Sequence, residues 1–376
     1  MRSIKYIIFS LIFLLIAGCI SQFIPETDEN QELVVVEGLI TDQYGIYTIK
    51  LSMSRPLSSK NIAKPLSGCI VTISDNLHNS YMLTETTSGT YATDPTQFQG
   101  MVGRKYTLNV KTNSPSTNNY SYESLPVEMK PVPKIDSIFY EKIISKEKDE
   151  FGPKEEGCQI YLNTHDPAGI CRYYRWDFTE TWEFRLPFNV TNSVCWLTRN
   201  SSVINIKSTS VLVEDRINRY LLNFISNETD RLKVKYNIMV NQYSLNEDEY
   251  IYWEKLRNIS EEVGSLYDIT PATVSGDIHC IEDPGEKVLG YFSVSAKSSR
   301  RIFIKENFSG IVNLYKECIS DTVFGTGPIP HLNTSVWILE DHTVVPPIFR
   351  VLTQTKGCAD CTVRGTNIEP DFWEDN

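Results

Sequence analysis

Apolar and polar side chains alternate along much of the first third of the chain, as they do on a β-strand with one buried face. In residues 47–54 and 105–111 every second residue is apolar and those between are polar, whereas 33–40 is an almost continuous apolar run. Successive side chains of a strand point to opposite faces, so this alternation predicts half-buried antiparallel strands. Glycines and Asp-Asn turns separate these short segments. The pattern therefore predicts a small β-sandwich, immunoglobulin-like or transthyretin-like, over residues 33–133.

A cluster of prolines ends this first domain. Pro126, Pro131 and Pro133 lie close together, and proline lacks the N–H group that a strand needs to donate within a sheet. Strand-like segments resume after them and continue to the C-terminus. A length of 376 residues is also that of about two domains. We therefore expect a larger, antiparallel β-rich domain over residues 134–376, which makes the whole chain mainly β.

One segment of the second domain has the spacing of a helix instead. Apolar residues at 253, 256, 259 and 263 recur every three or four positions. Ser244 and Glu247 precede them with the spacing of a capping box, and Gly264 follows where a helix would end. The pattern predicts one prominent helix at about 244–263, with its apolar stripe packed on the core.

The N-terminus has the order of a bacterial lipoprotein signal. Arg2 and Lys5 precede an apolar stretch of 12 residues, 6–17, which is too short to span a bilayer. The stretch ends in Leu-Ile-Ala-Gly-Cys, a lipobox in which the cysteine is acylated and becomes the new N-terminus. We expect residues 1–18 to be removed, Cys19 to carry lipid and residues 19–32 to form a flexible tether. The protein would then be attached to a membrane without spanning it.

The charge balance argues against one class of function. Lys and Arg number 36 against 47 Asp and Glu, a net charge of −11. Removal of residues 1–18 takes Arg2 and Lys5 away and leaves −11 − 2 = −13. Nucleic-acid binding needs clustered basic side chains, and the chain has no basic run. We therefore expect no nucleic-acid partner.

The cysteine count fits a protein outside the cytoplasm. Of nine cysteines, eight remain once Cys19 is set aside as the lipid anchor, and an even set in an oxidising compartment favours disulfides. The C-x-x-C pair near the C-terminus favours a structural disulfide over a metal or redox site, with Cys318 as a long-range partner for one of its thiols. The remaining pairing is open. The candidate disulfide cysteines are Cys158, Cys171, Cys195, Cys280, Cys318, Cys358 and Cys361.

No motif in the sequence carries chemistry. The five histidines form no H-E-x-x-H, and no G-x-S-x-G elbow or phosphate-binding glycine loop is present. Ser145 and Lys148 match S-x-x-K, but within a charged segment where the lysine would stay protonated. We expect no cofactor and no enzymatic activity. Four tryptophans near polar residues could stack on sugars or peptides, although core packing is favoured: Trp182, Trp196, Trp337 and Trp373.

Several segments in order resemble a family known only as a domain of unknown function, DUF4249. They include 36–42, 65–75 with Cys69 where alanine is more usual, 103–108, 290–293 and 358–361. The resemblance implies a Bacteroidota outer-membrane lipoprotein, exposed at the cell surface, that accompanies a TonB-dependent transporter. It implies no catalytic residues. Ser137 and Thr322, each between Asp and an apolar residue, resemble the O-glycosylation sites of that phylum.

Three functions are compatible with these observations. The leading hypothesis is a non-enzymatic, lipid-anchored accessory of a TonB-dependent transporter that captures a ligand or binds the transporter. The alternatives are a hydrolase acting on extracellular glycan or peptide, and a structural or adhesive surface protein. An accessory protein predicts an exposed apolar or aromatic patch at one end of the molecule. A hydrolase predicts a cleft that gathers titratable groups with perturbed pKa values.

Overall fold

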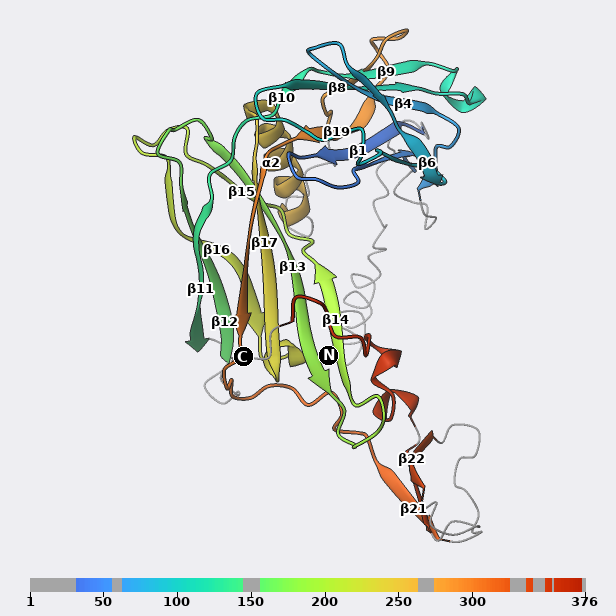
Figure 1. The fold of residues 1–376 in the computed structure, drawn as a ribbon, viewed down its shortest axis with the longest axis vertical. Helices are drawn as coiled ribbons and strands as arrows, with labels where there is room; N and C mark the ends of the chain where they lie inside the picture. The colour runs from blue at the N-terminus through green and yellow to red at the C-terminus, as the bar shows by residue number, and fades with distance from the viewer. Residues whose placement is uncertain are drawn as a thin grey trace, which may run out of the picture.

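The computed structural model describes residues 32–55, 63–144, 156–262, 274–324, 336–340, 349–353 and 355–373. Within these ranges the chain is mainly β, as predicted, and forms two domains and a small C-terminal sheet (Figure 1). Cys19, the Ser145–Lys148 motif and Gly264 lie outside the described residues. No helix in the described ranges is both long enough and apolar enough to cross a bilayer.

The first domain is a β-sandwich of two sheets. One sheet has the order β19 (Val288–Val294), β1 (Val34–Ile40), β2 (Thr48–Met53), β7 (Thr90–Ala92), β6 (Thr84–Thr87), with β3 (Lys64–Pro65) on β2. The other has the order β18 (Ile278–Cys280), β9 (Ser121–Ser124), β8 (Lys105–Lys111), β4 (Ile70–Asp75), β5 (Ser80–Met82), with β10 (Val127–Glu128) on β8. A short 3₁₀ turn, η1 (Pro115–Thr117), precedes β9.

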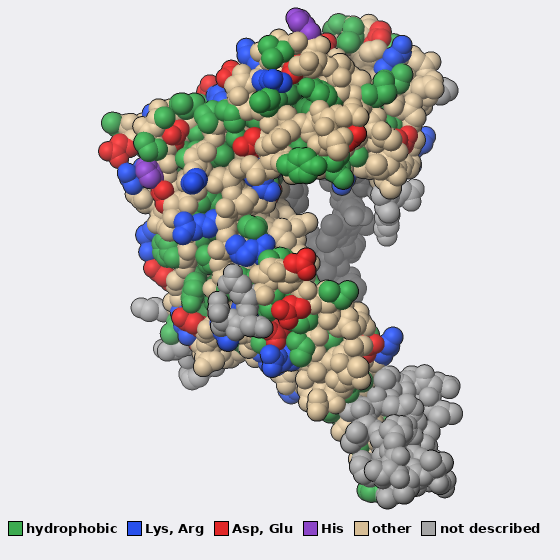
Figure 2. Space-filling view, in the orientation of Figure 1, with side chains coloured by type: hydrophobic (Ala, Val, Ile, Leu, Met, Phe, Trp, Pro, Cys, Tyr) green, Lys and Arg blue, Asp and Glu red, His purple; other side chains and the backbone are tan. Residues whose placement is uncertain are grey.

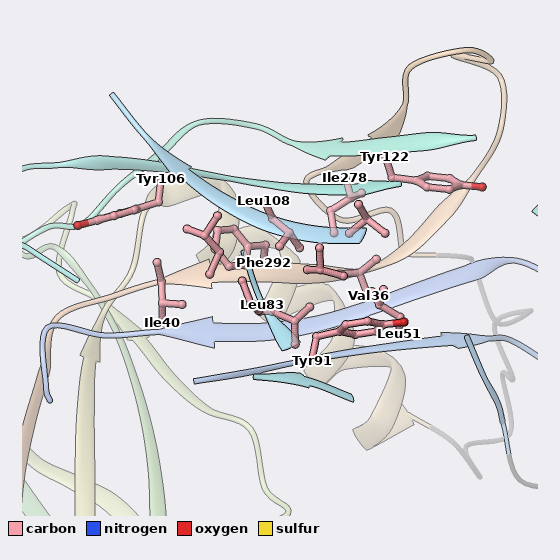
Figure 3. Close-up of a cluster of buried hydrophobic side chains, with 14 of the residues drawn as sticks. Val36, Ile40, Leu51, Leu83, Tyr91, Tyr106, Leu108, Tyr122, Ile278 and Phe292 are labelled. Atoms are coloured by element: carbon pink, nitrogen blue, oxygen red, sulfur yellow. The ribbon is translucent and has the colours of Figure 1, made fainter. Parts of the chain in front are cut away.

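The alternation seen in the sequence fills the space between these sheets. Ile49 and Leu51 of β2 are buried, as are Tyr106 and Leu108 of β8. In Figure 3 these strands' apolar side chains lie between the two sheets, together with Phe292 of β19. The local pattern therefore predicted the buried face of each strand correctly.

The boundaries of the domains differ from those predicted. β18 and β19 come from the part of the chain assigned to the second domain, yet each forms the edge of one sandwich sheet. β19 runs parallel to β1, with Val34 opposite Val288 and Ile40 opposite Val294. The sandwich thus contains 33–133 and a returning segment at 274–296. Local patterning could not reveal this, because these pairings join residues more than 150 positions apart.

Two glycines allow the returning segment to cross itself closely. Gly290 of β19 has a positive φ of 94°, and an added Cβ would lie 1.9 Å from the Val36 carbonyl oxygen. A Cβ on Gly276 would lie 1.5 Å from the Gly290 carbonyl oxygen. Only glycine fits at such contacts, so both positions fix how β19 joins β1.

The second domain consists of two antiparallel sheets that share one core. One has the order β11 (Ile135–Ile144), β12 (Glu156–His165), β16 (Arg216–Ser226). The other has the order β14 (Val194–Asn200), β13 (Tyr173–Arg185), β17 (Lys235–Ser244), β20 (Lys297–Ile304), with β15 (Asn205–Ser208) also on β13. The 3₁₀ turn η2 (Asp230–Leu232) precedes β17. Large aromatic residues from β13, such as Trp176 and Trp182, are buried between the sheets.

The predicted helix is present as α2 (Glu247–Glu262) and lies between the two domains (Figure 1). The predicted capping box is wrong. Ser244 ends β17, where its hydroxyl donates to the Lys130 carbonyl at 2.7 Å and accepts from the Ala296 N–H at 3.2 Å. The buried face of α2 is formed at its beginning by Glu249 and Tyr252, and the predicted stripe at Trp253, Leu256 and Ile259 is half-buried.

The C-terminal part adds a small sheet that projects from the second domain, at the lower right of Figure 1. Its strands are β21 (Ser320–Phe324), β23 (Phe349–Thr353) and β22 (Val336–Glu340), in that order. The chain then returns through the 3₁₀ turns η3 (Lys356–Cys358) and η4 (Cys361–Val363). Arg364 pairs with the buried Asp230 carboxylate, which holds this return on the second domain.

Replacement of Gly290 by alanine tests the close approach of β1 and β19. We expect Gly290→Ala to lower the free energy of unfolding by about 2–3 kcal/mol, because the Cβ meets a carbonyl oxygen and the φ is unfavourable for alanine. The measurement is urea unfolding. Gly45→Ala is the matched control, since no atom lies within 4 Å of its added Cβ. Equal stability of the two variants would contradict the assigned contact.

Candidate functional site

Two loops at one end of the second domain form an exposed apolar projection. They connect β12 to β13 and β15 to β16, and lie at the upper left of Figure 1. Val211 is 91% exposed and Val213 is 99% exposed, values rare for valine in a folded domain. Ile170 and Leu212 are also exposed. We name Ile170, Val211, Leu212 and Val213 the apolar tip. Hydrophobic side chains are visible on this projection in Figure 2.

Arg172 holds the two loops of the apolar tip together. Its guanidinium donates to the Gly169 carbonyl at 3.1 Å within its own loop. It also donates to the carbonyls of Thr209 and Leu212 in the other loop, at 3.3 and 3.2 Å. One planar cation thus donates to three carbonyl groups from two loops. The apolar tip therefore has a defined shape.

Two carboxylates beneath the apolar tip, Asp215 and Asp166, also hold these loops through hydrogen bonds. The Asp215 carboxylate accepts from the Thr209 hydroxyl at 2.7 Å and from the Tyr174 hydroxyl at 2.9 Å. Burial and the neighbouring Asp215 raise the pKa of Tyr174, so the phenol stays a hydrogen-bond donor. In the other loop, the Asp166 carboxylate accepts from the N–H groups of Ala168, Ile170 and Cys171 at 2.8–3.0 Å.

Such a tip is suited to contact with an apolar surface. Burying a valine side chain contributes about 1.5–3 kcal/mol, and a pre-shaped loop loses little conformational entropy when it binds. The sequence carried a signal that we did not use. Three consecutive apolar residues, 211–213, stand between Ser210 and Glu214 in a segment of turns. An apolar run in a turn is more informative than one in a strand, because the core cannot explain it.

Two disulfides join the C-terminal part to the rest of the chain. Cys318 pairs with Cys358, the long-range partnership expected for the C-x-x-C pair, and so closes the base of the small C-terminal sheet. Cys361 pairs with Cys195 and fastens η4 to β14. The two cysteines of the C-x-x-C pair thus bond to different partners. This arrangement is structural, as the sequence favoured.

The assignment of Cys158, Cys171 and Cys280 to disulfides is wrong. All three are free thiols, and so is Cys69. Cys158 and Cys171 lie within the core of the second domain, where burial raises the pKa of each thiol to about 12. They pack there as small apolar side chains. An even count suggested pairing, but it cannot show which thiols face one another.

The remaining predicted positions fall in different places. Trp182, Trp196 and Trp373 are buried, in agreement with core packing, and the side chain of Trp337 lies outside the described residues. Ser137 is half-buried on β11 and its hydroxyl accepts from the Asn163 amide at 2.9 Å. Thr322 is exposed on β21. Among the described residues, no group of histidine, cysteine, aspartate and glutamate could hold a metal.

A pair of carboxylates with raised pKa values lies elsewhere, beneath the sandwich. Glu249 of α2 is fully buried, and Asp277 before β18 is 6% exposed. Burial raises the pKa of both, that of Asp277 to about 7. No pattern in the sequence indicated that Glu249 is buried, because a glutamate in the first turn of a helix is ordinarily exposed.

The family comparison agrees with the resemblance seen in the sequence. The family model described as "Domain of unknown function (DUF4249)" matches residues 20–301. The matched range includes the sandwich, α2 and the returning strands β18 and β19, and it ends within β20. No curated protein matches the chain.

The two disulfides can be tested by removing one of them. We expect Cys361→Ser to lower the free energy of unfolding by about 2–5 kcal/mol, because Cys195 and Cys361 close a loop across 166 positions. Cys69→Ser, which removes a free and partly exposed thiol, should leave stability within about 0.5 kcal/mol of the wild type. Urea unfolding and non-reducing peptide mapping are the measurements. Peptides joining Cys361 to another cysteine would contradict the pairing.

Proposed function

The chain belongs to the DUF4249 family, and on that premise we propose that it is a lipid-anchored protein of a Bacteroidota outer membrane. It is exposed at the cell surface and acts without catalysis as an accessory of a TonB-dependent transporter. The observation that carries this proposal is the apolar tip, an exposed hydrophobic projection at one end of the molecule whose two loops are joined by hydrogen bonds. Surfaces of this kind mark contacts with a protein partner or a membrane.

The hydrogen bonds that hold the apolar tip in shape support a specific contact over a non-specific one. A flexible loop can keep its apolar residues in water at little cost in free energy, and it needs no buried carboxylate beneath it. Here Arg172, Asp166 and Asp215 fix the loops from below and beside. A loop that is already held in shape loses little conformational entropy when it binds, so more of its contact energy appears as affinity.

The lipid on Cys19 explains how so small a surface suffices. Four apolar side chains provide only weak affinity on their own. A tether confines the protein to the plane of the membrane that holds its partner, so the second contact becomes effectively intramolecular. The acidic chain, with a net charge of −13 after processing, also suits a partner surface that is apolar or basic.

The partner contact can be tested by adding charge to the apolar tip. Affinity purification from detergent-solubilised outer membranes should recover a TonB-dependent receptor with the wild-type chain. We expect Val211→Asp/Val213→Asp to reduce this recovery about tenfold or more, because two buried apolar contacts would become desolvated charges. This double variant should retain the wild-type melting temperature, because both mutated side chains are exposed to solvent.

The matched control is Val203→Asp, which makes the same substitution at an exposed valine in the β14–β15 connection. It should recover the receptor as the wild type does. Equal recovery with the tip variant would show that the apolar tip is not the contact. Recovery of no receptor by the wild type would overturn the accessory function itself.

Membrane attachment has its own test. Cells supplied with labelled palmitate should label the wild-type chain, and Cys19→Ala should abolish the label because no other residue accepts the acyl chains. Cys69→Ala is the control and should remain labelled. Label that persists in Cys19→Ala would refute the lipid anchor.

A further inference from the structure

The contact between the two domains contains a buried polar cluster. Its centre is Glu249 of α2, whose carboxylate accepts from the Ser293 hydroxyl of β19 at 2.6 Å and from the Trp253 indole N–H at 3.1 Å. Asp277, which precedes β18, accepts from the Phe292 N–H at 3.0 Å. The sandwich and α2 thus meet through a hydrogen bond to a carboxylate that water does not reach.

Several atoms of this cluster lack a partner among the described residues. They are one oxygen each of Glu249 and Asp277, the Nε of Arg175 and the hydroxyl of Ser295, all buried. A buried polar atom left unpaired destabilises the fold, because the loss of its hydrogen bonds to water carries a cost in free energy. A proton on one of the two carboxyl groups lowers this cost, because it removes a buried negative charge and supplies an O–H donor.

The charges around the pair are mostly negative. Among the described residues Arg175 of β13 is the cation that acts on Glu249, and its guanidinium lies 4.5 Å from the Trp253 ring and 4.9 Å from the Tyr243 ring. The other charged or titratable groups facing the cluster come from β1, α2, β13, β17 and β19. They are Glu37, Asp248, Asp177, Tyr252, Tyr243 and Tyr291.

One cation cannot neutralise two buried carboxylates. Glu249 is the better-stabilised anion, because Arg175 and two hydrogen-bond donors face it. Asp277 has the Phe292 N–H on one oxygen and a free second oxygen. We infer that Asp277 carries a proton when the two domains are docked, and that loss of this proton weakens the contact between the sandwich and the second domain.

The direction of the pH effect follows from the sign of the shift. Burial and the neighbouring Glu249 raise the pKa of Asp277 to about 7, above its value of 3.8 in the unfolded chain. The folded state therefore binds the proton more tightly, so its stability is highest at low pH. That stability is lost as pH rises from about 4 to about 7. Raised pH should weaken the contact between the sandwich and α2 before the rest of the fold, because both carboxylates lie at that contact.

The test compares thermal unfolding of the full chain at pH 5 and pH 8. We expect the wild type to unfold in one transition at pH 5 and in two at pH 8, because the weakened contact no longer makes the two domains unfold together. Asp277→Asn keeps the hydrogen bond from Phe292 without the charge. It should unfold in one transition at both pH values, and at pH 8 its transition should lie about 2–4 °C above the first wild-type transition. Wild-type behaviour in this variant would overturn the inference.

Two controls separate this effect from other titrations. His279 is exposed on β18, two residues from Asp277, and His279→Gln should keep the wild-type pH dependence. Glu247→Gln removes an exposed acid from the same helix turn as Glu249 and should also keep it. Should Asp277→Asn fail to fold, Trp253 fluorescence of the wild type remains. It should change with a midpoint near pH 7, and no change between pH 5 and pH 8 would refute the inference.

Discussion

The structure depends on one crossing of the chain between its two domains, where β19 passes into β20. Only two residues, Ser295 and Ala296, separate Val294 from Lys297. The Ser295 N–H donates to the Ile40 carbonyl at the end of β1, and the Ala296 N–H donates to the Ser244 hydroxyl at the end of β17. Each domain therefore holds one side of the crossing. So short a link cannot act as a free hinge, because its N–H groups are already paired on both sides.

This crossing explains why the sandwich needs residues from both halves of the sequence. The first part of the chain lacks one edge strand of each sheet, and β18 and β19 supply these two strands. Because β19 continues directly into β20 of the second domain, the fold of one domain places a strand of the other. The Lys297 N–H also donates to the Asp42 carboxylate at 2.8 Å, which ties the first strand's exit to the same point. The two domains are consequently one structural unit at the crossing.

The features predicted correctly from the sequence are those that neighbouring residues determine. Alternation at 47–54 and 105–111 defined buried faces, and spacing at 253–259 defined a helix, because both depend on side-chain direction within one element. Ser244 had the correct residue type for a helix cap, yet its hydroxyl instead donates to the Lys130 carbonyl and accepts from the Ala296 N–H. The predictions that missed the free thiols and the returning strands were wrong for the same reason. They depend on contacts between distant segments, which no local pattern records.

The candidate site shows the same division between what sequence records and what folding brings together. The apolar run 211–213 is visible in the sequence, but the polar frame beneath it is assembled from two loops. A loop that only connects β15 to β16 would need neither the Arg172 guanidinium nor the buried Asp215. Burying a carboxylate costs free energy unless it keeps hydrogen-bond partners. A frame that bears this cost while leaving valine side chains in water is best explained if the shape of the apolar tip itself is what the protein uses.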